Sequence, residues 1–197
     1  MAKKAIIIIP IVVIISLILV MMIKFNDGYA TMEEALSPSN PQSINILHEE
    51  KMDDGIVVFY NHSGWGDFSR ATVKKSTVGR FKILYSGVSG DIQRVLDKRG
   101  ISYSYWPAIE NASPPLYCGV IDSSIKQVKI VEGKRNYERE AKIIEVNDFR
   151  IWLVYMDQFQ GSKFNIIGIS GDGKEVISIE DSISPRYIEE KPLKGYE

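Results

Sequence analysis

The chain has 197 residues, with 24 basic and 25 acidic side chains, so its formal charge at pH 7 is −1. This balance excludes a protein that binds nucleic acid through a strongly basic surface. The single cysteine, Cys118, excludes an intrachain disulfide, and its apolar neighbours predict a buried, unreactive thiol.

The first predicted element is an apolar run over residues 5–23, which directly follows Lys3 and Lys4. As a helix this run would reach about 28 Å, close to the hydrocarbon thickness of a bilayer. Because the basic residues precede the run, the positive-inside bias predicts residues 1–4 in the cytoplasm and the following chain outside the cell membrane. Cleavage of a signal peptide near Ala30, followed by secretion, is the alternative.

Residues 24–43 are predicted to form a stalk with one short helix. Thr31 and Glu34 have the spacing of a capping box, and the prolines at positions 38 and 41 stop a helix that begins there. We therefore expect a single docking turn between the anchor and the first strand.

A first β-rich half is predicted over residues 44–110. Its last strand shows the period of two that is typical of one buried face, with Phe81, Ile83 and Tyr85 on that face. The expected strands cover residues 56–60, 68–73 and 81–85.

One soluble helix is predicted in this half, over residues 91–99. Asp91 can cap its first turn, and Gly100 lies where helices commonly end. The preceding segment Gly87–Gly90 is expected to form the turn that leads into this helix.

A second, antiparallel β half is predicted over residues 111–183, with a mobile tail over residues 184–197. The turn signals Asn147–Asp148 and Asp172–Lys174 are of the kind that closes tight hairpins. The predicted fold class is therefore α+β and predominantly antiparallel β, with small sandwich or barrel-like sheets after one N-terminal transmembrane helix. Its strands are expected at residues 116–121, 125–131, 141–146, 149–155, 164–169 and 175–179.

Two aromatic segments, residues 61–67 and 103–106, are the candidate surfaces for a ligand or partner. Exposed aromatic side chains offer a large contact area at a small entropic cost, which suits binding of sugars, peptides or proteins. The alternative is that the two tryptophans fold back over the core. The candidate contacts are His62, Trp65, Asp67, Tyr103, Tyr105 and Trp106.

No motif in the chain predicts a catalytic residue, a metal ligand or a cofactor. Two histidines lack the further ligands at known metal spacings, and no serine lies on a nucleophile elbow. An envelope-acting hydrolase that uses His62 with Asp67 or Glu110 as acid and base stays open as an alternative.

Several segments of the chain are similar to those of small exported or membrane-anchored proteins of Bacillus-like bacteria, a family without an assigned activity. The resemblance implies a bacterial cell-surface protein and transfers no catalytic residue. It is carried by Glu33–Leu36, Asp54–Tyr60, Val73–Lys75, Gly79, Phe81–Tyr85, Arg150–Trp152 and Asp172–Lys174.

These observations together predict a single-pass, membrane-anchored extracytoplasmic protein that binds or assists at the bacterial cell envelope. The expected partners are the membrane, through residues 5–23, and an envelope protein or glycan, without nucleic acid. An extracytoplasmic sensor subunit is a further alternative, although residues 1–4 are too short to signal without a membrane partner.

Overall fold

The computed structural model describes residues 14–17, 20–21, 27–64, 66–109, 111–146 and 149–183. Most of the predicted anchor, the turn Asn147–Asp148 and the predicted tail lie outside these ranges. Within them, no helix combines the length and the apolar character needed to cross a bilayer.

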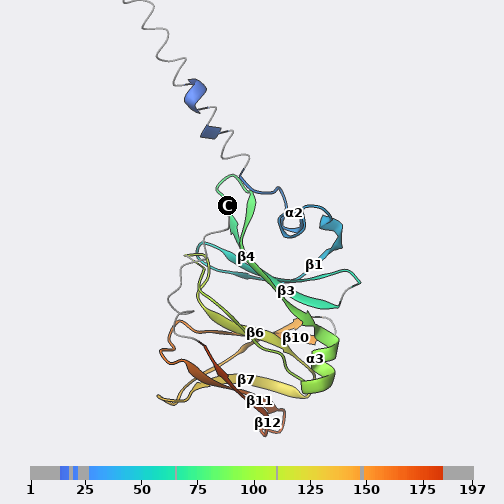
Figure 1. Ribbon diagram of the computed structural model, residues 1–197, viewed down its shortest axis with the longest axis vertical. Helices are drawn as coiled ribbons and strands as arrows, with labels where there is room; N and C mark the ends of the chain where they lie inside the picture. The colour runs from blue at the N-terminus through green and yellow to red at the C-terminus, as the bar shows by residue number, and fades with distance from the viewer. Residues whose placement is uncertain are drawn as a thin grey trace, which may run out of the picture.

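Three four-stranded antiparallel sheets stack on one another and form the body of the protein (Figure 1). The first sheet has the order β1 (Ile44–Lys51), β2 (Ile56–His62), β3 (Asp67–Lys75), β4 (Phe81–Asp91). The middle sheet has the order β5 (Ser104–Trp106), β6 (Leu116–Ile121), β10 (Phe149–Tyr155), β9 (Lys142–Val146). The third sheet has the order β12 (Glu175–Ser182), β11 (Lys163–Ser170), β7 (Ile125–Glu132), β8 (Tyr137–Glu140). The sheets are accompanied by the short helices α2 (Met32–Leu36), η1 (Pro41–Ser43) and α3 (Ile92–Arg99).

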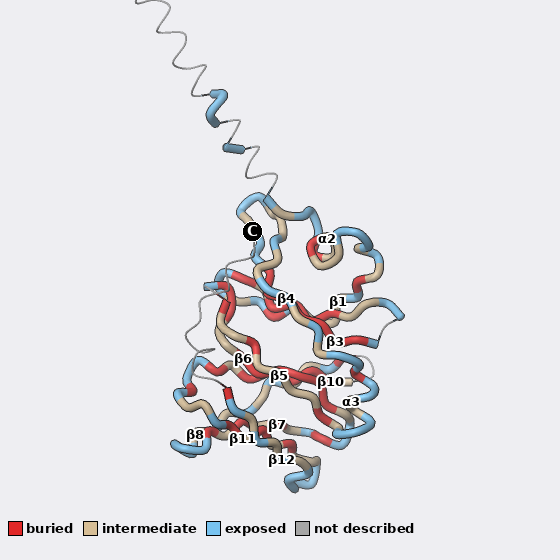
Figure 2. Tube along the Cα trace, in the orientation of Figure 1, coloured by how far each residue is buried: buried red, intermediate tan, exposed pale blue. Residues whose placement is uncertain are grey.

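The middle sheet is buried on both faces, as the red segments between the layers in Figure 2 show. In β10, Ile151 and Leu153 face the first sheet, whereas Trp152 and Val154 face the third sheet. All six residues of β6 are buried, which explains why its sequence is an unbroken apolar run rather than an alternating one. The two predicted halves therefore share a core.

Helix α2 covers the outer face of the first sheet. The Thr31 side chain accepts a hydrogen bond from the backbone of Glu34, and the Glu34 carboxylate accepts one from the backbone of Thr31, so the predicted capping box is confirmed. Met32 and Ala35 are buried against the sheet. Tyr29 forms an antiparallel bridge with Phe81, which ties the segment before α2 to the start of β4.

The strand β4 differs from its predicted pattern in two ways. A bulge shifts its register on β3 between the pairs Thr72–Tyr85 and Val73–Ile83. Because one extra residue turns the following side chains to the other face, Tyr85 does not share the face of Ile83, as predicted, but contacts Trp106 on the inner face. The predicted turn at Gly87–Gly90 is also wrong, since β4 continues through these residues.

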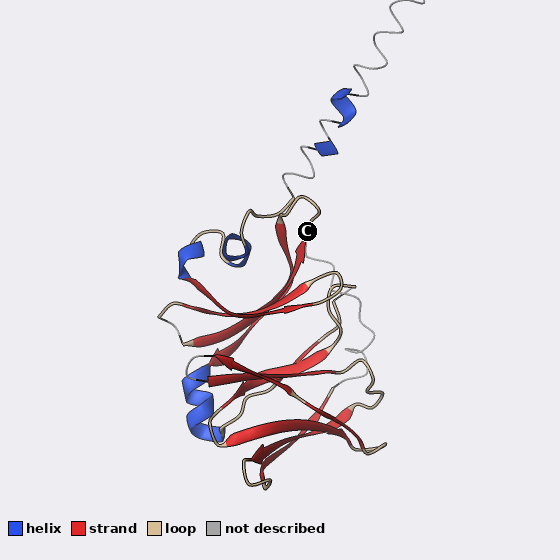
Figure 3. Cartoon of the chain, turned by 180° about the vertical axis from the view of Figure 1, so that it is seen from behind, coloured by secondary structure: helices blue, strands red, loops and turns tan. Residues whose placement is uncertain are grey.

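Helix α3 follows β4 directly and lies at one side of the stack (Figure 3). Asp91 accepts a hydrogen bond from the backbone of Arg94, and Gly100 ends the helix with a φ of 67°, so both predicted helix boundaries are confirmed. After the helix, β5 pairs with β6 in the middle sheet. The segment 103–106, predicted as a loop of the first half, is thus partly an edge strand of the second sheet.

The predicted antiparallel β class is confirmed, and the strands expected at 116–121 and 149–155 have those bounds in the structure. The turn Asp172–Lys174 closes the β11–β12 hairpin, with Gly173 at a φ of 82°. No strand was predicted at β8, because its Tyr-Glu-Arg-Glu sequence lacks the apolar residues by which strands were recognised.

Glu50 joins the first and middle sheets through a polar network at their edges. Its carboxylate accepts hydrogen bonds from Lys142 Nζ at 2.7 Å, from Tyr155 Oη at 2.8 Å and from His48 Nε2 at 2.9 Å. Burial alone would raise the pKa of Glu50, but these donors outweigh it and lower the pKa. The network therefore holds a charged carboxylate between two sheets.

Glu132, at the end of β7, connects the turn between β7 and β8 to the loop that precedes β11. Its carboxylate pairs with both Arg135 Nε at 2.9 Å and Arg135 Nη2 at 2.7 Å, and it also accepts from the backbone of Gln160. The bonds from Arg135 are the largest cause that lowers the pKa of Glu132, to about 2. Because this pKa lies below that of the unfolded chain, the stabilisation is complete above about pH 4.5 and disappears as the pH falls toward 2.

Replacing Glu132 with glutamine is expected to lower the free energy of unfolding by about 2 kcal/mol at pH 7. At pH 2.5 the difference in the free energy of unfolding between the variant and the wild type should be smaller, since the wild-type carboxyl is then partly protonated. Urea unfolding of the purified protein at both pH values measures this. Glu138→Gln is the matched control, because Glu138 lies in an exposed pair with Lys129. A Glu132→Gln effect that is the same at both pH values would contradict the account.

Candidate functional site

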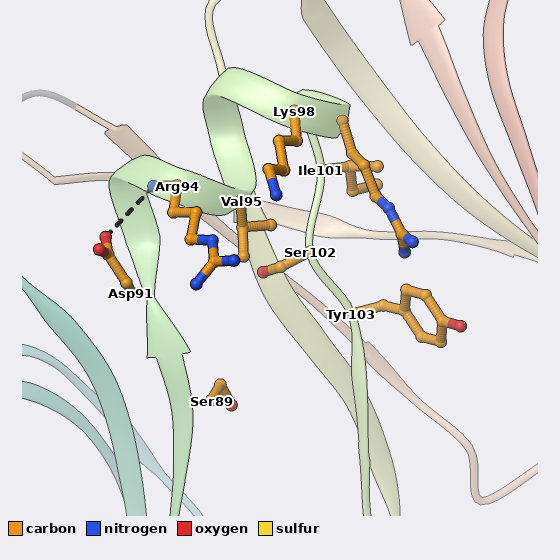
Figure 4. Close-up of a pocket in the computed structure, with 9 residues that line it drawn as sticks. Ser89, Asp91, Arg94, Val95, Lys98, Ile101, Ser102 and Tyr103 are labelled. Atoms are coloured by element: carbon orange, nitrogen blue, oxygen red, sulfur yellow. Dashed lines mark hydrogen bonds between the residues drawn. The ribbon is translucent and has the colours of Figure 1, made fainter.

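A cavity of about 440 Å³ lies between α3, the end of β4 and the segment that leads into β5 (Figure 4). Its volume is within the range that holds small organic ligands. Nine residues line it: Ser89, Asp91, Arg94, Val95, Lys98, Arg99, Ile101, Ser102 and Tyr103.

The charge of this cavity is predominantly positive. Arg94 and Lys98 are one helical turn apart on α3, and Arg99 follows at its end. Figure 4 shows the charged ends of Arg94 and Lys98 directed toward the Ser102 hydroxyl. None of the three cations forms an ion pair with an acid among the described residues. Asp91 is the one acid in the lining, and it caps α3 through the backbone of Arg94 at 3.2 Å.

Arg70, on β3, is a further cation close to the cavity, directly behind its lining residue Ser89. Its side chain is only 5% exposed, and Nη1 donates to Ser89 Oγ at 3.0 Å, a residue of the cavity lining. The guanidinium stacks over the Trp106 ring at 4.5 Å and also donates to Ser104 and to Cys118 Sγ. Within the described part of the chain, none of these partners carries a negative charge, and Arg70 Nε has no partner at all.

Cys118 is fully buried, as its apolar neighbours predict. Burial raises the pKa of its thiol, although the neighbouring Arg70 works in the opposite direction. The sulfur thus stays protonated, accepts a weak hydrogen bond and does not supply a counter-charge.

A second cavity, of about 590 Å³, lies at the β1–β2 turn. It has no electrostatic preference of this kind, since three acidic and three basic side chains line it. They are Glu49, Asp53, Asp54, Lys51, Lys74 and Lys75. The cavity beside α3 is therefore the better candidate for recognition of a charged ligand.

The structure brings His62 and Asp67 together. His62 Nδ1 lies 2.8 Å from Asp67 Oδ2, and the His62 backbone donates to Asp67 Oδ1 at 2.8 Å. The buried Ser69 hydroxyl also donates to Asp67, at 2.6 Å, rather than to the imidazole. Burial alone would raise the pKa of Asp67, but these bonds outweigh it and lower the pKa. The three groups therefore lack the serine-to-histidine contact of a hydrolytic triad.

The remaining predicted contacts have different surroundings. Trp106 is 2% exposed and donates Nε1 to Thr72 at 2.9 Å, so of the two alternatives for this tryptophan the structure shows the one in which it folds back over the core. Tyr103 lines the cavity beside α3, whereas the Tyr105 ring packs against Tyr117 in the other core. Trp65 and Glu110 lie outside the described residues.

The sequence reasoning missed Arg70, Arg94, Lys98 and Arg99. The spacing of Arg94 and Lys98 on a predicted helix was a signal that these two cations share a face. Nothing in the sequence indicates that Arg70 points into a core. Within the described ranges, no group of three or more histidine, cysteine, aspartate or glutamate side chains could hold a metal ion.

Comparison with known proteins gives a weak likeness. The chain is 24% identical over 176 residues to the phosphoribosylformylglycinamidine synthase subunit PurL of two strains of Sinorhizobium fredii. The match covers 83% of this chain and 22% of those proteins, so the chain spans about a fifth of their length. No family model and no solved structure matches the chain.

Proposed function

We propose that this chain is a single-pass membrane-anchored protein of the bacterial cell envelope whose β-rich domain binds a ligand outside the cytoplasm. The observation that carries the binding role is the cavity beside α3, where three cations that pair with no described acid line one hollow together with three hydroxyl groups. Clefts lined by one sign of charge concentrate oppositely charged ligands, and concave sites with a few polar groups are typical of ligand binding.

The apolar run over residues 5–23 supports the membrane part of the proposal. Two short stretches of this run are described, residues 14–17 and 20–21, and both are helical. All five of their large apolar side chains are more than half exposed. Exposed apolar side chains of this kind are unfavourable in water and favourable in lipid. Lys3 and Lys4, which precede the run, favour an N-terminus in the cytoplasm.

Protease accessibility tests the location of the domain. With a tag at the C-terminus, we expect an external protease to remove the tag from the full-length, membrane-bound protein in intact cells, where a cytoplasmic control protein survives. Protection until detergent opens the membrane would overturn the proposed orientation. Recovery of a shortened, tagged protein from the medium would overturn the anchor and favour cleavage near Ala30.

A further inference from the structure

The lining of the cavity beside α3 contains many hydrogen-bond donors and few acceptors. Arg94, Lys98 and Arg99 contribute only donors, because guanidinium and ammonium groups have no acceptor. The Asp91 carboxylate, the one acid in the lining, already accepts from the backbone of Arg94. A ligand that fits this set must supply acceptor atoms.

Two serines in the lining extend the donor set. Ser89 Oγ accepts from Arg70 Nη1 at 3.0 Å, and Ser102 Oγ accepts from the backbone of Val120 at 2.9 Å. A hydroxyl that already accepts a bond from the protein still has its own hydrogen to donate. In Figure 4 the Ser102 hydroxyl lies below the charged end of Lys98 and beside that of Arg94.

Arg70 adds an independent argument for a negative ligand. A buried charge is costly unless an opposite charge or a full set of hydrogen bonds compensates it. Arg70 is buried, its partners among the described residues are neutral, and its Nε has none of them as a partner. Its bond to Ser89 connects it to the cavity wall. An anion in the cavity would supply the missing opposite charge through the polarised Ser89 hydroxyl.

On these grounds we infer that the cavity binds a small organic phosphate, whose phosphate group contacts Arg94, Lys98 and the two serines. Arginine forks match the oxygen pairs of such groups. The side chains of Val95, Ile101 and Tyr103 provide an apolar wall for the remainder of the ligand. The inference rests on the proposed binding function and names the class of ligand for that site.

The placement of the cavity favours a dissolved ligand over a lipid headgroup. The segment that follows the proposed anchor attaches at Phe81, through the bridge to Tyr29, whereas the cavity lies beyond the other end of β4, at Asp91. Eleven residues of extended chain separate the two ends, about 30 Å. The cavity therefore lies at the end of the first sheet that is remote from the point where the chain would leave the bilayer.

Isothermal titration calorimetry of the full-length protein in phosphatidylcholine nanodiscs, with phenyl phosphate as the probe, tests the inference. We expect saturable binding that weakens at least tenfold in the double variant Arg94→Gln, Lys98→Gln. The matched control is Lys126→Gln, Lys163→Gln, which removes two exposed lysines of the third sheet and should bind as the wild type does. Ser89→Ala should weaken binding about threefold or more, because it removes the hydroxyl that Arg70 holds.

The possible outcomes separate this inference from the proposed location. No saturable heat with phenyl phosphate, or equal losses in both double variants, overturns the inference. Binding that appears only when phosphatidylglycerol is added to the nanodiscs overturns it in favour of a lipid headgroup. Thermal unfolding by circular dichroism verifies that each variant is folded. If the tag is accessible in intact cells but phenyl phosphate does not bind, the inference is overturned and the proposed location is retained. If phenyl phosphate binds but the tag is protected in intact cells, only the proposed location is overturned.

Discussion

Replacing Gly119 with alanine is expected to lower the free energy of unfolding by about 4 kcal/mol or more, enough to unfold a marginally stable domain. Gly119 lies in β6, opposite Trp152 of β10. An added Cβ would meet the backbone oxygen of Ser102 at 2.0 Å and Trp152 Nε1 at 2.9 Å. The clash also disrupts the hydrogen bond between those two atoms, so the middle sheet could accept the methyl group only by moving backbone.

Urea unfolding of the purified protein in mild detergent, followed by circular dichroism, measures this loss. Gly133→Ala is the matched control, because a Cβ at Gly133 meets no atom within 4 Å and its φ is not positive. We expect the control to change the stability by less than about 0.5 kcal/mol. Similar midpoints for the two variants would contradict the close approach at Gly119.

Replacing Trp106 with alanine is expected to cost about 4 kcal/mol, the range for deleting a large buried aromatic side chain. The ring fills the space between the first and middle sheets, lies 4.6 Å from the Tyr85 ring centroid and supports Arg70 by stacking. Its loss would leave both a void and a less compensated buried cation. Trp106→Phe should cost less, about 2 kcal/mol, since it retains an aromatic ring but loses the bond to Thr72.

The same denaturation experiment tests this expectation, with Val88→Ala as the control. Val88 is a large apolar residue of neighbouring β4 that is 67% exposed, so its truncation should change the stability by less than about 0.5 kcal/mol. If Trp106→Ala were as mild as this control, the burial of Trp106 between the two sheets would be contradicted.

The sequence was most informative where local chemistry decides the structure. The Thr31–Glu34 capping box, the Asp91 cap and Gly100 are local signals, and each has the predicted role. The largely apolar sequences of β6 and β10 also predicted their bounds, because burial on both faces of a strand leaves a direct trace in composition.

The remainder could not be predicted because it depends on contacts between distant segments. A bulge in β4 changes the face of Tyr85 without any sequence signal that we recognised. Arg70 lies between Ser69 and Ala71 without a local signal for burial, yet the stacking of the middle sheet buries it beside Trp106. The candidate cavity likewise needs α3, β4 and the segment before β5 in one place, which only the sheet order provides.

The shared middle sheet also determines when the protein can complete its fold during synthesis. The first sheet is complete once Asp91 has emerged, but Val57 and Phe59 on its inner face have no cover until the middle sheet forms. That sheet pairs β6 with β10, so it cannot close before Tyr155 is available. An apolar surface therefore stays uncovered while some sixty further residues are added, a period in which a growing or translocating chain is most exposed to misassembly.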